Sequence, residues 1–150
     1  MSARLLLIAG FVGLAGCGSK SGPPAPNMPT VEIVVPKGFT GPVWVIQDAS
    51  APDLLTADKS CQVKVPAGGV VKTRSIQTLE NQHHLTAKFE DGTPLPLSNE
   101  VDDATVALRG GDPGAIRRGR QQVSYVVYYV GVEQPAGLFL TGDTTPKAGK

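Results

Sequence analysis

Cysteine and histidine have the most reactive side chains in this 150-residue chain, and the chain contains two of each. Cys61 is a candidate nucleophile, because a thiol beside an imidazole is readily activated, and His83 and His84 are the available imidazoles. The two histidines are also a candidate metal pair. Adjacent strand residues point to opposite faces, however, and a zinc site usually needs three or four protein ligands. We therefore expect Cys61 in the core and both histidines at the surface or a strand edge.

A glycine-rich basic segment, Gly110 to Gln122, invites comparison with phosphate-binding loops. It lacks the Gly-Lys-Ser/Thr ending of such loops, and no helix is predicted to follow it. Its three arginines, Arg117, Arg118 and Arg120, are candidates for contact with anionic headgroups or a polyanionic envelope polymer. The alternative is a solvated hairpin loop whose charge is balanced by neighbouring aspartates.

Aromatic side chains offer a second kind of binding chemistry. Trp44, Tyr128 and Tyr129 could stack on the flat faces of sugar rings if they point outward, and the alternative is burial in the core. Neither Gly-x-Ser-x-Gly nor His-Glu-x-x-His occurs in the chain. The sequence therefore predicts no catalytic residues and no metal ligands.

The segments that must position these side chains are short, rich in β-branched residues and separated by Gly, Pro, Asn and Asp, a pattern typical of an all-β domain. We expect seven or eight strands in a small antiparallel β-sandwich. The clearest segments are 31–35, 42–46, 61–65, 84–89, 105–109, 123–130 and 138–140, with 70–73 as an additional short strand.

Alternation of apolar and polar residues assigns faces to these strands. Cys61, Val63 and Val65 share one face, which we expect to point inward. Residues 123–130 are apolar on both faces apart from Ser124, which indicates a central strand or one whose outer face is covered. The glycines and the proline of residues 110–114 predict a loop before that strand.

Composition sets limits on function. Fourteen basic against thirteen acidic side chains give a formal charge of +1, which argues against a nucleic-acid partner. Within residues 30–143 the formal charge is −3.

The first seventeen residues have the layout of a secretory signal, with Arg4, an apolar run from Leu5 to Val12 and small residues before Cys17. The apolar run is too short to span a membrane. The stretch Leu14-Ala15-Gly16-Cys17 resembles the lipobox of bacterial lipoproteins. That resemblance implies cleavage before Cys17, a diacylglycerol on its thiol and an acyl chain on its freed amine. The aspartate that retains such proteins in an inner membrane is missing after Cys17, which favours an outer membrane if the cell has two.

A second resemblance begins at Val35-Pro-Lys-Gly-Phe-Thr-Gly-Pro-Val-Trp-Val-Ile46. This stretch is similar to the opening of a family of uncharacterised bacterial lipoprotein domains, in which a strand ends in Pro-x-Gly-aromatic-x-Gly and leads into a second strand. The turn Val65-Pro-Ala-Gly-Gly-Val70 and the strand end Tyr128-Tyr-Val-Gly131 agree with the family pattern. These motifs imply a fold and no catalytic residues.

The sequence thus predicts a signal peptide (1–16), a lipidated cysteine with a proline-rich tether (17–29), a β-sandwich domain (30–143) and a tail (144–150). We expect a lipid-anchored, non-enzymatic binding or structural accessory module of the cell envelope, facing the periplasm where there is one. The membrane is its expected partner through the lipid, with an envelope protein or a glycan as a further partner and no cofactor beyond the covalent lipid. The alternatives are a glycan- or peptidoglycan-binding module, and an enzyme or metal protein that uses Cys61 with His83 or His84.

Overall fold

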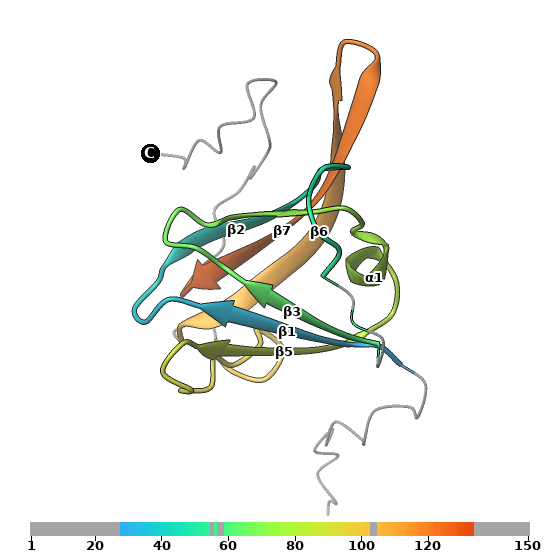
Figure 1. Cartoon of the computed structure of the whole chain (residues 1–150). Coiled ribbons are helices and arrows are strands. Elements are labelled where there is room, and N and C mark those ends of the chain that lie inside the picture. Colours follow the sequence, from blue (N-terminus) through green and yellow to red (C-terminus); the bar gives the residue numbers. More distant parts are fainter. Residues whose placement is uncertain (1–27, 55, 57–58, 103–104, 134–150) are drawn as a thin grey trace, which may run out of the picture.

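The computed structural model describes residues 28–54, 56, 59–102 and 105–133, which form two packed β-sheets (Figure 1). The elements are β1 (Thr30–Val35), β2 (Gly41–Gln47), β3 (Ser60–Lys64), β4 (Val70–Thr73), α1 (Gln77–Glu80), β5 (His84–Phe89), β6 (Ala107–Arg118) and β7 (Gln121–Gly131). Sheet A has the strand order β3-β1-β5, and sheet B has the order β4-β2-β7-β6. The all-β fold is confirmed, and residues 70–73 form the additional short strand.

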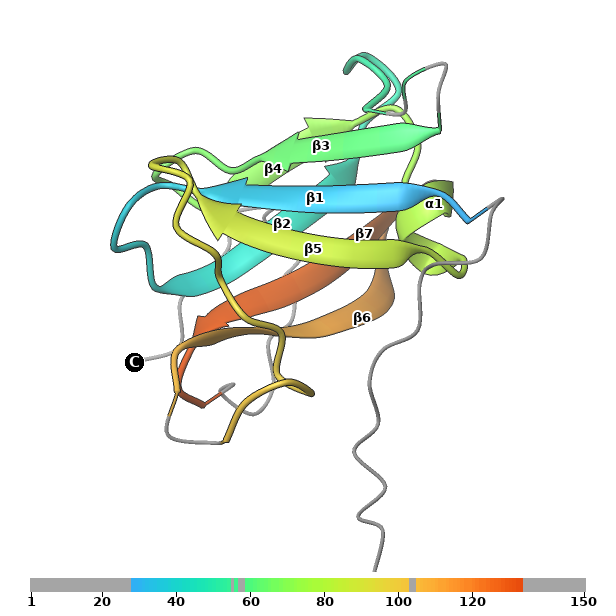
Figure 2. The same ribbon diagram turned by 90° about the horizontal axis from the view of Figure 1, so that it is seen from below.

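Strand pairing is mixed, which corrects the expectation of a purely antiparallel sandwich. β1 pairs in parallel with both β3 and β5, and β2 pairs in parallel with β4, whereas β7 is antiparallel to β2 and to β6. The reason is the path of the chain, which crosses to the opposite sheet after each of the first five strands (Figure 2). A strand that returns to its sheet after such a crossing runs parallel to the strand before it in that sheet, whereas β6 and β7 follow each other directly as a hairpin and run antiparallel.

The main core lies between the two sheets. The residues predicted to point inward from β3 and the residue that follows it are buried: Cys61 is 4% exposed, Val63 0% and Val65 2%. They pack in one cluster with inward residues of β1, β2 and β7, among them Ile33, Val45 and Val126. The alternation predicted for this segment is confirmed.

β7 and its neighbour β2 are also buried on the face that points away from this core. Trp44, Ile46, Tyr125 and Val127 form a second apolar cluster there, and the Trp44 and Tyr125 rings meet edge to face with centroids 5.5 Å apart. β7 lies inside sheet B, between β2 and β6. The expectation of a central strand with a covered outer face is confirmed.

The loop predicted for residues 110–114 is wrong, because these residues belong to β6. β6 is the edge strand of sheet B, where the missing N–H of Pro113 is tolerated. Gly111 is the extra residue of a β-bulge. The glycines also make room for rings from β7: a Cβ at Gly111 would lie 3.1 Å from Tyr128 Cε1, and one at Gly114 would collide with Tyr125.

Several predictions concern residues outside the described ranges. These are the signal peptide (1–16), Cys17 and most of the tether, the strand at 138–140, the end of the domain and the tail at 144–150. Among the residues that the structure describes, no helix has the length and apolar character needed to cross a membrane.

Substitution of Gly114 tests the account of β6. In Gly114→Ala the added methyl collides with the Tyr125 ring, so we expect the free energy of unfolding to fall by about 1–3 kcal/mol in urea titrations. Gly68→Ala is the matched control, because a Cβ at Gly68 meets nothing within 4 Å. Equal stability of the two variants would contradict this packing.

Candidate functional site

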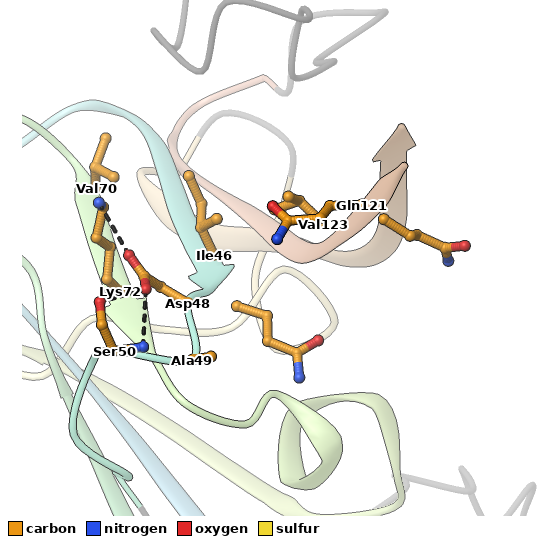
Figure 3. A pocket seen from close by; sticks show the side chains of 10 residues that line it. Ile46, Asp48, Ala49, Ser50, Val70, Lys72, Gln121 and Val123 are labelled. Atoms are coloured by element: carbon orange, nitrogen blue, oxygen red, sulfur yellow. Dashed lines mark hydrogen bonds and ion pairs between the residues drawn. The ribbon is translucent and has the colours of Figure 1, made fainter. Parts of the chain in front are cut away.

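A cleft of about 710 Å³ opens where β2 and β4 end and β7 begins (Figure 3). It brings together three segments that are distant in the sequence, because β4 and β7 lie on either side of β2 in sheet B. The lining residues are Ile46, Gln47, Asp48, Ala49, Ser50, Val70, Lys72, Gln121, Gln122 and Val123. The cleft therefore combines aliphatic side chains with hydrogen-bonding and charged groups.

Asp48 organises one wall of the cleft. Its Oδ1 accepts hydrogen bonds from the Ser50 backbone N–H (3.0 Å) and from Ser50 Oγ (2.6 Å), and its Oδ2 lies 3.1 Å from Lys72 Nζ. The Asp48 backbone N–H donates to the Thr73 carbonyl oxygen at 2.8 Å, which ties the turn to β4. The hydrogen bonds from Ser50, followed by the contact with Lys72, lower the pKa of Asp48 to about 2.

Glutamine side chains supply further hydrogen-bonding groups around the cleft. Gln47 Nε2 donates to the carbonyl oxygen of Arg74 at 3.3 Å, and Gln121 and Gln122 lie exposed on the opposite side. Amides both donate and accept hydrogen bonds. The cleft therefore presents hydrogen-bond donors, hydrogen-bond acceptors and charged groups, the chemistry that a polar ligand with hydroxyl, amide or charged groups would match.

The Cys61 thiol and the His84 imidazole lie on opposite faces of sheet A. Cys61 is paired with Val31, which is paired on its other side with Leu85, in a row of sheet A that faces the core. His84 is paired with Thr30 in the preceding row, which faces the other way. Burial, followed by repulsion from Asp53, raises the pKa of Cys61, so its thiol stays protonated at neutral pH.

The imidazole of His83 contacts the backbone two residues earlier in the chain. Its Nδ1 lies 2.8 Å from the Asn81 carbonyl oxygen, and the ring is only half-buried, as is that of His84. Within the described ranges, no three His, Cys, Asp or Glu side chains are grouped closely enough to hold a metal ion.

The aromatic residues predicted as sugar platforms occupy different positions. Trp44 is 0% exposed and Tyr128 is 2% exposed, so neither offers a free ring face, and the stacking role predicted for them is wrong. Burial also raises the pKa of Tyr128, with a further contribution from Cys61. Tyr129 is half-buried, with its ring against Gly131.

The predicted basic residues lie at the tip of the β6–β7 hairpin. Arg117 and Arg120 are exposed, and Arg118 is the last residue of β6. They lie close in the chain to Gln121 and Gln122 of the cleft, and neither Arg117 nor Arg120 is among the residues that line it.

Sequence reasoning missed the cleft. Its polar residues are types common in turns and on surfaces, and they converge only through the pairing of β2 with β4 and β7. The one local signal is Asp48-Ala49-Ser50, the pattern of an aspartate that caps its own turn.

Comparisons with known proteins find little similarity. No protein-family model matches the chain, and no curated protein matches its sequence. One similar solved structure is described as a "Putative Lipoprotein from Bacillus anthracis"; it is 13% identical, with a TM-score of 0.47, and the match covers 69% of this chain and 71% of that chain. This likeness is too distant to assign a family, so the proposed family resemblance stays a prediction.

The low pKa of Asp48 predicts a specific acid response. Its pKa falls from an ordinary 3.8 to about 2 on folding, so the ionised form stabilises the fold above about pH 4, and this contribution is lost as the pH falls towards 2. Asp48→Asn should be less stable than the parent at neutral pH and should lose less stability between pH 4 and 2. Urea titrations across that range measure both effects, and parallel pH profiles for the two proteins would contradict the assignment.

Proposed function

We propose that this protein is a lipid-anchored protein of the cell envelope and acts as a non-enzymatic binding module. The observation that carries its location is the order of Arg4, the apolar run from Leu5 to Val12, and the sequence Leu14-Ala15-Gly16-Cys17. The anchor is a diacylglycerol and an acyl chain on Cys17. Several chains on one residue hold a protein at a bilayer far more durably than a single chain does.

The tether explains how an anchored domain reaches its partner. Residues 18–29 contain four prolines and small polar residues, a composition that favours an extended chain of about 3.1 Å per residue. Twelve such residues would span roughly 35 Å. In a cell with two membranes, Gly18 and Ser19 after the lipidated cysteine favour the outer membrane.

The cleft favours binding over a purely structural role. Its aliphatic and polar lining resembles that of sites that orient a ligand through a few placed hydrogen-bonding groups. The separation of the Cys61 thiol from His84 by the plane of sheet A supports a role without nucleophilic catalysis.

A glycan remains a second candidate ligand, through the cleft and not through exposed rings. Ser50, Gln121 and Gln122 carry hydroxyl and amide groups that pair well with sugar hydroxyls. Titration of the full mature protein with soluble peptidoglycan fragments tests this version. Saturable binding that Gln121→Ala/Gln122→Ala weakens would support it, and no binding at millimolar ligand would remove it.

The anchor is tested by removing the lipidated cysteine. Cys17→Ser has no thiol to accept the diacylglycerol, so we expect the mature lipid-modified N-terminus to disappear and the protein to leave the detergent phase on phase partitioning. Mass spectrometry of the N-terminal peptide measures the modification directly. Cys61→Ser is the matched control and should keep the lipid, because Cys61 is buried in the core. A wild-type chain without lipid on Cys17 would overturn the proposal.

The cleft is tested by photocrosslinking in cells. A photoreactive residue in place of Gln122 should form a discrete adduct, whereas one at Thr86, on the outward face of sheet A, should not. Replacing Asp48 and Lys72 with alanine should remove the adduct by changing the opposite wall. Adducts that form equally at both positions, or that persist in the double variant, would contradict a binding role for the cleft.

A further inference from the structure

The β6–β7 hairpin extends beyond the rest of sheet B. β2 pairs with β7 only as far as Ile46 opposite Tyr125, and the last four pairs of the hairpin, from Ala115 opposite Ser124 to Arg118 opposite Gln121, have no third strand beside them. At about 3.4 Å per residue, this overhang is about 14 Å long. Figure 1 shows it projecting from the body of the domain.

The overhang concentrates positive charge on a domain that is otherwise acidic. Residues 115–124 include three arginines and no acidic residue, although residues 30–143 as a whole have a formal charge of −3. Arg117 and Arg120 are exposed, and neither takes part in an ion pair within the described ranges. Three charges on a narrow projection can approach an anionic surface without bringing the acidic body into contact with it.

We propose that this hairpin tip, residues 115–124, is a second membrane contact that binds anionic lipid headgroups. The inference rests on the proposed lipid anchor and its tether, because residues 18–29 could span roughly 35 Å and so let the domain turn the tip towards the bilayer. Tethering turns a weak contact into an intramolecular one with a high effective concentration. Each basic residue near an anionic bilayer strengthens binding about fivefold. Three arginines are therefore enough to hold the tip of a domain that is already tethered. They would bind a free domain to the bilayer only marginally.

The proposed tethering also makes a bilayer a better ligand for the tip than a soluble polyanion. A polymer must be captured from solution by three charges, whereas the headgroups are held beside the domain by the anchor. Contact would tilt the domain and place the neighbouring cleft, lined by Gln121 and Gln122, close to the membrane surface.

Energy transfer to labelled lipids tests the contact on the mature lipidated protein. A donor dye on Gln121→Cys reports on the tip, and one on Thr40→Cys, in the turn between β1 and β2, reports on the body. Lipidated Cys17 has no free thiol, and Cys61 is buried, so labelling is specific. The protein is compared on vesicles of phosphatidylcholine alone and of phosphatidylcholine mixed with phosphatidylglycerol.

We expect energy transfer from the tip label to the labelled lipids to be higher on vesicles that contain phosphatidylglycerol, and to fall again at high salt. Arg117→Gln/Arg118→Gln/Arg120→Gln should abolish the rise. The matched control, Lys37→Gln/Lys59→Gln/Lys64→Gln, removes three exposed charges from the body and should retain it.

The results of this experiment distinguish failure of the headgroup contact from failure of the lipid anchor. A chain that binds neither vesicle and carries no lipid would overturn the proposed function and this contact with it. An anchored chain whose tip shows the same transfer on both vesicles, or the same rise after the arginine substitutions, would overturn the contact alone. Tighter binding of soluble polyphosphate than of the phosphatidylglycerol surface would also overturn it in favour of a polymer.

Discussion

The apolar core between the two sheets is the constraint on which the rest of the structure depends. Each of the first four strands buries alternate residues in it, and the chain crosses to the opposite sheet after each one. This path makes the neighbouring strands β1 and β3, and likewise β2 and β4, parallel. It also brings the ends of β2 and β4 together, beside the start of β7, and the cleft forms there. The polar site is thus a consequence of how the valine-rich strands share one core.

Local patterns in the sequence predict the strands and their inward faces well. The alternation around Cys61 identifies the buried row correctly, because one side of β3 faces the core and the other faces solvent. Residues 110–114 fail as a loop for a physical reason: Gly111 and Gly114 lie opposite tyrosine rings of β7. That role is set by strand pairing, and no local pattern of glycines reveals it. The cleft could not be predicted for the same reason, since its walls come from three separate segments.

Burial on both faces of β2 and β7 explains why the sugar-stacking role predicted for Trp44 and Tyr128 is wrong. A ring that points away from the main core would normally reach solvent, yet Trp44 joins Tyr125 and Val127 in a second cluster. Trp44 Nε1 has no hydrogen-bond partner within the described part of the chain, so its ring is retained there through apolar packing. Aromatic residues on a strand therefore predict a ligand platform only where that strand has one solvated face, and the run of apolar residues in β7 already argued against such a face.

The chemistry of the cleft favours recognition over proton transfer. A general acid or base works best with a pKa near the working pH, and the hydrogen bonds from Ser50 together with Lys72 move the pKa of Asp48 to about 2, away from neutrality. The glutamines of the cleft do not titrate. An ionised carboxylate held in one orientation, a paired ammonium and several amides can fix the position of a ligand, and they supply no activated nucleophile. The cleft therefore fits the proposed binding role, and the proposed headgroup contact of the nearby arginine tip would set the orientation of the domain at the membrane.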